Sequence, residues 1–389
     1  MNQTYDVVVV GGGVSGLSAG LSASAKGAKT LVIDRKKQIG TPVRCGEFFP
    51  TPNEASSLLP DSESFKRFYA LIRNDAISNK TKTIRVFSPH GRKYEFPFEG
   101  WVLRREIFEK TIAEEAVNEG ARIQTSTSID AIQKLENGMK IRVRGVKGEA
   151  FLNAKVVIGA DGFPSRIVDR KEIEPYIKDD NLALCAQTKA SDARVDEEVV
   201  EMHMGLKYSP GGYAWVIPKG AGEVNVGVGM RLSYLKRGRS VANYLTDFTQ
   251  NHPIVSRYLQ GARFAPLIAK LLPVGGMAPF LYGDGRLLVG DAAGLVIATN
   301  GSGIPTALAS GHIGGEVAAR HVSDRTDLSV YADALKKEVG KPLGRTCIYR
   351  RMGDVFMRSD WAFERLLQII GTGNLAKVVK GVPIRPFFR

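Results

Sequence analysis

Three glycines near the N-terminus and one acid further along have the spacing of a nucleotide-binding site. Gly11, Gly13 and Gly16 form the pattern G-x-G-x-x-G, and Asp34 follows after one more predicted strand. In such a pattern Gly11 permits a sharp turn, Gly13 lets the backbone approach a pyrophosphate, and Gly16 allows close helix–strand contact. An acid at the position of Asp34 accepts hydrogen bonds from ribose hydroxyls, which favours FAD or NAD over NADP.

The residues around these glycines predict the elements that position them. An unbroken β-branched run at 7–10 indicates a buried parallel strand, and small residues at 18–20 let the next helix lie close to the sheet. The second strand, TLVID, ends at Asp34. Because a helix N-terminus presents free N–H groups and a positive dipole end, it suits phosphate. Strand, glycines, helix, strand and acid together predict a dinucleotide site, whereas the glycines alone are weak evidence.

Two later segments repeat the order of strand, tight turn and acid. VVIGADGFPSR (156–166) leads into Asp161, and GRLLVGDAAGLVIATNGSGIPTALASG (285–311) leads into Asp291 before a glycine-rich turn opens a helix. Taken from the residues alone, Asp291 lies near an anion-friendly helix terminus. In this order and at these distances, the three motifs resemble the flavoprotein family that includes p-hydroxybenzoate hydroxylase.

This resemblance selects FAD as the cofactor and implies roles for particular residues. Asp291 is expected to bind the ribityl chain, and the backbone of Gly303 and Ile304 is expected to lie beside the isoalloxazine. Arg105, at the start of a helix with an apolar face at Phe108, Ile112 and Ala116, stands where the family places an arginine near the cofactor; without the resemblance it is equally a surface residue. The expected cofactor-binding residues are Gly11, Gly13, Gly16, Asp34, Arg44, Cys45, Gly46, Arg105, Ile129, Asp161, Asp291, Gly303 and Ile304.

The stretch YSPGGYAWVIPKG (208–220) combines aromatic residues with glycines and prolines. Its glycines and prolines predict an irregular segment rather than a regular strand. Tyr213 and Trp215 are two residues apart, so an extended backbone points both side chains to one face. The pair therefore serves either as core or as the wall of a binding pocket.

Together with IGTPVRCGE (39–47), the pattern P-x-x-Y-x-W-x-x-P at 210–218 is similar to the geranylgeranyl reductase family, over nearly the whole chain. Two positions depart: Ile217 replaces the usual Phe, and FFP follows RCGE where smaller residues are expected. The resemblance implies an apolar cavity that holds a long-chain isoprenoid lipid beside the flavin. Tyr213, Trp215 and Pro218 are the expected substrate contacts.

Reduction of a prenyl double bond makes particular demands on the site. The bond is not polarised, so the hydride from reduced flavin must arrive together with a proton on the other carbon, away from water. Cys45 is the preferred candidate for the proton donor, with Glu47 and Tyr213 as alternatives. The structural alternative for Cys45 is a small buried apolar residue, a common role of free cysteine.

Composition and charge restrict the remaining possibilities. The net charge is +14, and residues 341–389 hold ten Lys or Arg against three acids, with an apolar stretch at 361–371. This region is either a solvated basic tail or a contact with an anionic membrane. No nucleic-acid-binding motif is present. The three cysteines and five histidines lack ligand spacing, which predicts neither a metal site nor an iron–sulfur cluster.

The sequence thus predicts an α/β (α+β composite) fold. A discontinuous Rossmann-type FAD-binding domain is expected at 1–95, 96–172 and 283–325, an antiparallel-sheet substrate domain at 173–282, and a basic helical region at 326–389. Without a basic leader or an apolar run of eighteen residues, the chain is expected in the cytoplasm, peripheral to the inner face of the membrane.

The predicted activity is FAD-dependent reduction of geranylgeranyl double bonds, with archaeal-type ether lipid precursors as the expected substrate. A diphosphate or the prenyl tail of a quinone remains possible on the same reasoning, and so does a flavin monooxygenase on the same scaffold. A quinone-linked electron-transfer flavoprotein dehydrogenase is disfavoured by the cysteine count, and a non-enzymatic prenyl carrier by the intact cofactor motifs. The electron donor is left open among ferredoxin, a deazaflavin and NAD(P)H.

Overall fold

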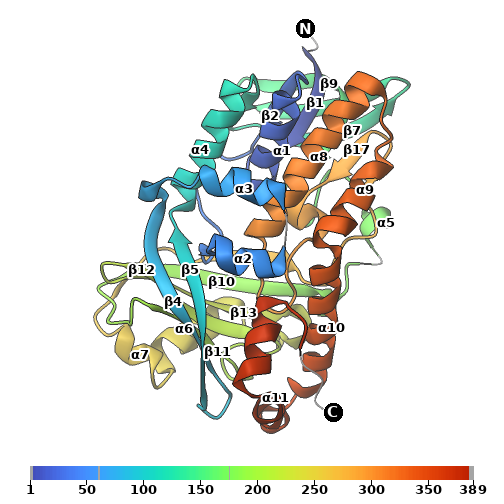
Figure 1. Ribbon diagram of the computed structural model, residues 1–389. Coiled ribbons are helices and arrows are strands. Elements are labelled where there is room, and N and C mark those ends of the chain that lie inside the picture. Colours follow the sequence, from blue (N-terminus) through green and yellow to red (C-terminus); the bar gives the residue numbers. More distant parts are fainter. Residues whose placement is uncertain (1–2, 60–61, 175, 385–389) are drawn as a thin grey trace.

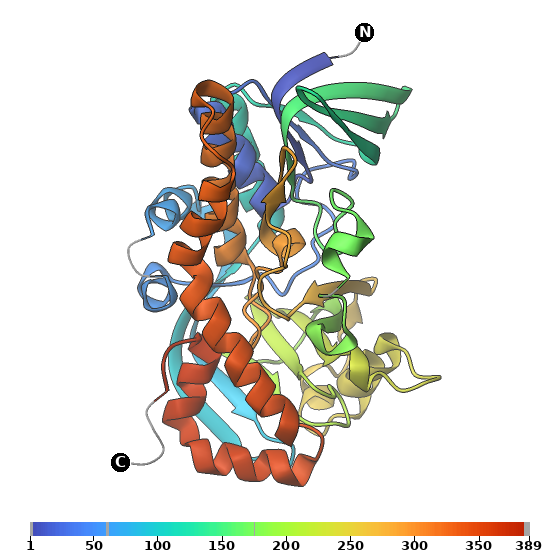
Figure 2. The same ribbon diagram turned by 90° about the vertical axis from the view of Figure 1, so that its right-hand side faces the viewer.

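The computed structural model describes residues 3–59, 62–174 and 176–384. Two β-sheets lie one above the other in Figure 1, and helices α8, α9 and α10 run along one side of both. Figure 2 shows these helices continuing from the first sheet down to the second, where α11 turns back beneath it.

The first sheet has the strand order β16-β17-β9-β1-β2-β6, and a meander of β7 and β8 joins at β9. Strand β1 pairs in parallel with β2 and β9, with Val7 opposite Thr30 on one side and Val156 on the other. Its apolar run is completely buried, as the sequence predicts. The strands are β1 (Gln3–Val10), β2 (Thr30–Ile33), β6 (Arg122–Gln124), β7 (Ser128–Leu135), β8 (Gly138–Gly145), β9 (Gly148–Gly159), β16 (Tyr282–Gly283) and β17 (Arg286–Leu288).

Parallel pairing brings the carboxyl ends of β1, β2, β9 and β17 to one edge of this sheet. The loops that follow these strands hold the glycine motif, Asp34, Asp161 and Asp291, respectively. The fold therefore gathers acids that are far apart in sequence at a single edge, where open α/β sheets bind their ligands.

Helices α1 (Val14–Ala25) and α8 (Ile304–Asp324) cross each other closely on this sheet. A Cβ placed on Gly311 would lie 2.2 Å from the Ser15 carbonyl oxygen, and one on Gly315 would lie 2.3 Å from that of Ala19. Glycine is required at both crossings because no side chain fits there. Helix α4 (Arg105–Asn118) buries Phe108, Ile112 and Ala116, which confirms the predicted face.

The second sheet has the order β14-β10-β13-β12-β11-β4-β5-β3, with β15 paired to β10. One face carries helices α6 (Val241–Asn251) and α7 (Val255–Tyr258), against which Ala214 and Val216 pack. The opposite face carries Trp215 and Ile217, which pack with the C-terminal helix α11. The strands are β3 (Phe48–Pro50), β4 (Ile77–Phe87), β5 (Lys93–Leu103), β10 (Leu182–Ser191), β11 (Val199–His203), β12 (Tyr213–Gly220), β13 (Glu223–Arg231), β14 (Arg263–Phe264) and β15 (Ile268–Pro273).

One expectation about this sheet was wrong. Residues 213–220 form the regular strand β12, and only the preceding 208–212 are irregular. Pro218 is tolerated because the pairing with β11 ends at Val216, before the missing N–H would be needed. Strands β3, β4 and β5 lie within residues 1–172, which the sequence analysis assigns to FAD binding, and they pair in the second sheet, where β4 is parallel to β11.

Three further helices complete the C-terminal region: α9 (Ser329–Leu335), α10 (Lys341–Phe356) and α11 (Asp360–Lys380). Helix α11 bends at Gly371, which has a φ of 64°. The shorter helices are α2 (Pro52–Leu58), α3 (Glu63–Ala70) and α5 (Arg170–Ile173). Among the described residues, every helix is too short or too polar to cross a bilayer.

Candidate active site

A cavity of about 1060 Å³ is lined by the loops at the carboxyl edge of the first sheet and by one face of the second. Helices α10 and α11 contribute further lining through apolar side chains. Almost all of the predicted site residues line it. The exceptions are Gly16, which is used in packing, and Pro218, which is buried away from the cavity with its carbonyl accepting from Asn79. The expectation that Pro218 contacts substrate is therefore not supported by its position.

The glycine motif leaves room for a phosphate group. Gly11 has a φ of +112°, and a Cβ on it would lie 2.3 Å from the Ala160 carbonyl oxygen. A Cβ on Gly16 would lie 1.8 Å from the Gly11 carbonyl oxygen, whereas one on Gly13 would meet no atom within 4 Å. Gly13 caps α1 without a side-chain hydrogen bond, so the first N–H groups of this helix are free to bind an anion.

Asp34 and Arg105 line the same side of the cavity. The carboxylate of Asp34 is buried and accepts from the N–H groups of Gly12 and Lys36, each at 2.8 Å. Burial opposes the charge of Arg105, but Glu109 and Cys45 raise its pKa, so the guanidinium stays protonated. Arg105 Nε is buried and has no hydrogen-bond partner within the described part of the chain, as expected where a polar ligand supplies one.

The two later acids have different surroundings. Asp161 accepts from Ser165 Oγ and from the Arg166 N–H, both at 2.7 Å, and burial raises the pKa of its carboxyl group. Asp291 lies beside Gly303, where a Cβ would approach its Oδ1 to 3.2 Å. Lys270 of β15 pairs with Asp291 at 2.5 Å, which places a cation at the site. The free N-terminus of α8 begins directly after Gly303.

These features fit FAD. The open glycine turn suits a pyrophosphate, Asp34 suits ribose hydroxyls, and Asp291 suits a ribityl chain at the N-terminus of α8. The unpartnered Arg105 Nε lies in the same cavity. The roles of the individual residues toward FAD remain predictions.

The Cys45 segment lies directly on strand β12. A Cβ on Gly46 would meet Ile217 at 2.8 Å and the Trp215 indole nitrogen at 3.7 Å. The Cys45 carbonyl accepts from Gln187 Nε2 at 3.0 Å and from Asn225 Nδ2 at 3.3 Å. The RCGE segment (44–47) and the aromatic strip, which consists of Tyr213 and Trp215, are far apart in the sequence. The structure places the two motifs side by side.

Glu47 is fully buried and has a positive φ of 66°. Its carboxylate faces Lys219 Nζ at 2.7 Å, Lys189 Nζ at 3.1 Å and the Arg105 N–H at 3.3 Å. The N–H of Glu47 in turn donates to Cys45 Sγ at 3.2 Å. This arrangement is that of an anchor for the loop, and it disfavours Glu47 as the proton donor.

The aromatic strip points into the cavity. The rings of Tyr213 and Trp215 lie 6.0 Å apart, which confirms that they share a face. Burial raises the pKa of Tyr213, whose hydroxyl donates to the Asn300 carbonyl in the turn before α8. Trp215 donates from its indole N–H to Asn225 Oδ1 at 2.8 Å. Both polar groups are therefore engaged in holding neighbouring segments.

Cys185 is a cavity-lining thiol that the sequence analysis did not single out. It lies on β10, and burial raises its pKa to about 12. Sequence reasoning also missed Gln187, Lys219, Asn225 and Lys270. The one available signal was a polar residue within an apolar strand, such as Asn225 in EVNVGVG.

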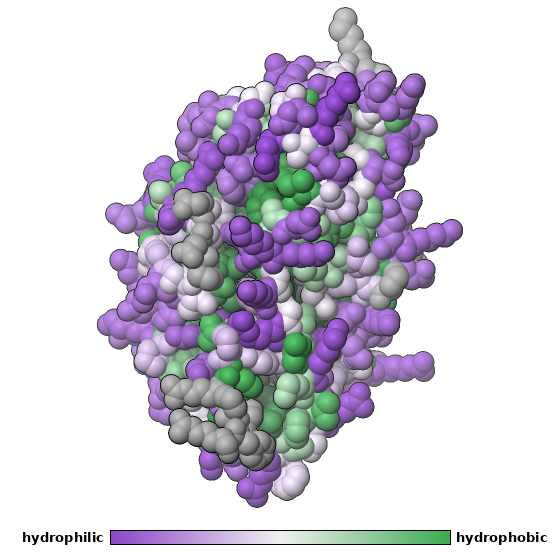
Figure 3. Space-filling view, turned by 45° about the vertical axis from the view of Figure 1, so that its right-hand side comes forward, coloured by the Kyte–Doolittle hydropathy of each residue, from purple (hydrophilic) through white to green (hydrophobic). Residues whose placement is uncertain are grey.

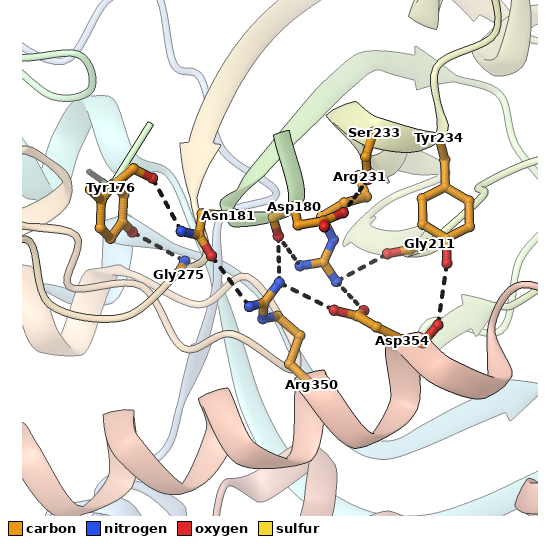
Figure 4. A network of polar contacts seen from close by, with 10 residues as sticks. All are labelled: Tyr176, Asp180, Asn181, Gly211, Arg231, Ser233, Tyr234, Gly275, Arg350 and Asp354. Carbon is orange, nitrogen blue, oxygen red and sulfur yellow. Dashed lines mark hydrogen bonds and ion pairs between the residues drawn. The ribbon is translucent and has the colours of Figure 1, made fainter. Parts of the chain in front are cut away.

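A polar network borders the cavity at α10 (Figure 4). Asp354 accepts from Arg231 at 2.8 Å and from Arg350 at 3.2 Å. Arg231 also donates to the carbonyls of Asp180 and Gly211. Burial raises the pKa of Asp354, and the two arginines oppose that rise. The network ties α10 to β13 and to the glycine turn that precedes the aromatic strip.

Comparison with known proteins agrees with this geometry. The model of the FAD dependent oxidoreductase family matches residues 6–162, and that of the geranylgeranyl reductase catalytic domain matches residues 181–261. The chain is 33% identical to digeranylgeranylglycerophospholipid reductase 2 of Methanopyrus kandleri, over 97% of this chain and 93% of that protein. It is 32% identical to a digeranylgeranylglycerophospholipid reductase of Methanocella arvoryzae, over 89% and 86%, respectively.

Solved structures show the same architecture. A geranylgeranyl bacteriochlorophyll reductase-like protein of Thermoplasma acidophilum has a TM-score of 0.80 and 26% identity, covering 99% of this chain and 94% of that one. The myxobacterial chondrochloren halogenase, at 15% identity and a TM-score of 0.72, covers 97% and 92% and shares the fold. The chain belongs to the geranylgeranyl reductase family of FAD-dependent oxidoreductases.

Proposed function

We propose that this reductase saturates the geranylgeranyl double bonds of archaeal-type ether glycerophospholipids. Its relatives in Methanocella arvoryzae and Methanopyrus kandleri are named as digeranylgeranylglycerophospholipid reductases, which supports this substrate class. The observation that carries the proposal is a single cavity with two kinds of wall. One wall consists of the cofactor loops, and the other consists of apolar side chains from β11, β12 and α11. A long prenyl chain in this cavity lies next to the flavin.

The apolar wall is suited to a flexible hydrocarbon. The side chains of Met202, Trp215 and Ile217 line it from the sheet, and those of Phe363 and Leu367 line it from α11. Burial of each CH₂ group contributes about 0.8 kcal/mol, so a prenyl chain gains substantial binding free energy here. The same apolar walls exclude water from the reacting double bond.

Bound FAD, once reduced, supplies the hydride for the double bond. The chain's own residues then have to hold the alkene still and deliver the proton. We assign proton delivery to Cys45, because its loop is fixed on the wall by Gln187 and Asn225 and Cys45 lines the cavity. Tyr213 is the second candidate, although its hydroxyl is already directed at the Asn300 carbonyl.

Each of the two sheets has its own proposed role. We assign FAD binding to the first sheet with α1, α4 and α8, and substrate binding to the second sheet with α10 and α11. Strands β3 to β5 go to the substrate part in this assignment.

We also propose a peripheral contact between residues 341–389 and an anionic membrane at the inner face of the cell, supported by the basic charge of that region.

The proposal is tested by incubating dithionite-reduced protein with three prenyl compounds under argon: a digeranylgeranyl glycerophospholipid, geranylgeranyl diphosphate and a prenylated quinone. Mass spectrometry should show gain of two hydrogens per double bond, fastest with the glycerophospholipid. Fastest reduction of the quinone tail would replace the proposed substrate. Reduction of none of the three, with FAD bound, would refute the proposed activity.

A further inference from the structure

Helix α10 presents an apolar stripe to solvent. Ile348, Met352, Val355 and Phe356 have exposed fractions of 56, 54, 69 and 39%. Their spacing of i, i+4, i+7 and i+8 places them on one face of the helix. Exposed apolar side chains that are scattered singly are ordinary, whereas four together on one helix face indicate a contact surface.

Two exposed side chains of α11 have the same character. Trp361 is 65% exposed and Ile369 is 73% exposed, and Arg365 stacks over the Trp361 ring at 5.8 Å. Figure 3 shows hydrophobic atoms among hydrophilic ones on the lower part of the molecule, where α10 and α11 lie in Figure 1. We call the six side chains the α10–α11 face: Ile348, Met352, Val355, Phe356, Trp361 and Ile369.

The charges around this face are sorted by sign. All three acids of residues 341–389 are turned toward the protein body: Asp354 accepts from two arginines, Asp360 from the Leu206 N–H, and Glu364 from the His90 N–H. Basic side chains remain exposed among the described residues of the same region, namely Lys341, Arg351, Arg358 and Arg365. An apolar stripe flanked by exposed basic groups is complementary to anionic head groups over a hydrocarbon layer.

The cavity lies directly behind these helices. Tyr349 and Gly353 of α10 line it, as do Met357, which follows α10, and Leu366 and Ile370 of α11. Met352 belongs to both surfaces, since it lines the cavity and is also half exposed. Met352 therefore places part of the cavity wall at the α10–α11 face.

We propose that the α10–α11 face docks on an anionic lipid bilayer and that prenyl chains pass from the bilayer into the cavity beside Met352. This inference rests on the proposed function, because it requires a lipid substrate. Transfer of a geranylgeranyl chain from the bilayer into water costs about 0.8 kcal/mol of free energy per CH₂ group. A portal at the docked face lets the chain enter the cavity without this transfer. The polar network of Arg231, Arg350 and Asp354 (Figure 4) lines the same cavity as Met352, and a head group would remain at these polar side chains.

This proposal changes the expectation from the sequence, which placed the apolar contact at 361–371. In that stretch Phe363 and Leu367 are buried, and they join the cavity wall and the apolar core of the second sheet instead. Of this stretch, Trp361 and Ile369 belong to the exposed face, and α10 supplies the rest.

Docking is tested by sedimentation with vesicles that contain phosphatidylglycerol. The double variant Ile348→Asp/Val355→Asp changes two exposed side chains that do not line the cavity, so it should fold normally. Vesicle partitioning should fall on the order of 10-fold or more, since two apolar contacts are lost and two repulsive charges are added. Val146→Asp is the matched control, because Val146 is 88% exposed in the turn between β8 and β9 and should bind like the wild type.

Unchanged partitioning of the double variant would overturn the docking proposal. A change in sedimentation coefficient without a change in vesicle binding would also overturn it, by assigning the face to contact between copies of this chain. Reduction of water-dissolved geranyl diphosphate by the wild type and by the double variant checks, independently of vesicle binding, that both proteins are active reductases. If the wild type reduces no prenyl compound yet binds vesicles through this face, the proposed function fails while the docking result stands.

The portal is tested with Met352→Trp, and Val355→Trp serves as the control on the same helix. Both variants keep an apolar side chain on the face and should bind vesicles normally. Met352→Trp should slow reduction of vesicle-embedded lipid several-fold by narrowing the mouth, whereas Val355→Trp should not. Equal rates in both variants would exclude passage beside Met352.

Discussion

The indole N–H of Trp215 donates a 2.8 Å hydrogen bond to the side-chain carbonyl of Asn225. Because Asn225 also donates to the Cys45 carbonyl, this bond links the aromatic wall of the cavity to the loop that carries the proposed proton donor. Trp215 thus helps to hold this loop in addition to lining the cavity.

Replacing Asn225 should therefore affect catalysis more than binding. In Asn225→Leu the Cys45 carbonyl keeps Gln187 as its one side-chain donor among the described residues, and the indole N–H loses its acceptor. Loss of a buried hydrogen bond costs about 1–3 kcal/mol, so we expect kcat to fall about 10-fold or more with KM nearly unchanged. The check is steady-state kinetics together with the alkylation rate of Cys45, which should change as the loop loosens. Unaltered kcat and alkylation would show that Asn225 only fills space.

The buried ion pair between Glu47 and Lys219 should be a large single contribution to local stability. Lys219→Met leaves the fully buried Glu47 carboxylate with Lys189 as its remaining ammonium partner. Removing one partner of a buried pair typically costs about 3–5 kcal/mol, and the retained Lys189 should bring the loss toward the lower end. Urea unfolding measures the loss in free energy of unfolding, and the double variant Glu47→Gln/Lys219→Met should recover part of that loss. A double variant less stable than the single one would contradict this account.

Asp291 is expected to control retention of FAD. In Asp291→Ala the expected ribityl contact is removed and Lys270 loses the carboxylate it pairs with, so FAD affinity should decrease by about 10-fold or more. Lys270→Met is the control that separates the two effects, because it keeps the carboxylate. Fluorescence titration of apoprotein with FAD measures both. Equal affinities for the wild type and Asp291→Ala would show that the acid has no part in cofactor binding.

The stability of the second sheet should depend on pH through His252. Burial lowers its pKa to about 3, whereas the ordinary histidine value is 6.5. Between these values the unfolded chain binds a proton that the folded chain does not, so the free energy of unfolding should rise with pH across this window. The slope from this group is at most about 1.4 kcal/mol per pH unit, and it falls to about half of that near pH 6.5. Urea unfolding of His252→Gln at pH 4.5 to 6.5 should show a shallower dependence than the wild type, and parallel profiles would refute this.

Local patterns predicted much of the FAD-binding part. The glycine motif, the valine run and the helix that begins after Gly303 are all patterns of residues close together in the sequence. The structure confirms the valine run as β1 and the helix as α8. Residue spacing also placed Tyr213 and Trp215 on one face correctly.

The contacts that assemble the site depend on pairing between distant strands. Asn225 and Gln187 reach Cys45 only because β10 and β13 are neighbours in a sheet that also includes β4 and β5. Nothing local in residues 77–103 indicates that they join β11, more than ninety residues later. Pro218 led to the wrong prediction of an irregular segment for the same reason. A strand tolerates this proline only because the pairing of β12 with β11 ends at Val216.

The most direct test of the central claim is a single-turnover experiment without oxygen. Reduced, FAD-loaded protein is mixed with a digeranylgeranyl glycerophospholipid, and oxidised flavin is followed by its visible absorbance while the product is weighed. We predict reoxidation that matches the number of double bonds saturated. The rate should fall about 100-fold in Cys45→Ser if its thiol is the general acid, and Tyr213→Phe should have little effect. Flavin that stays reduced until oxygen is admitted would contradict the assignment and favour a monooxygenase.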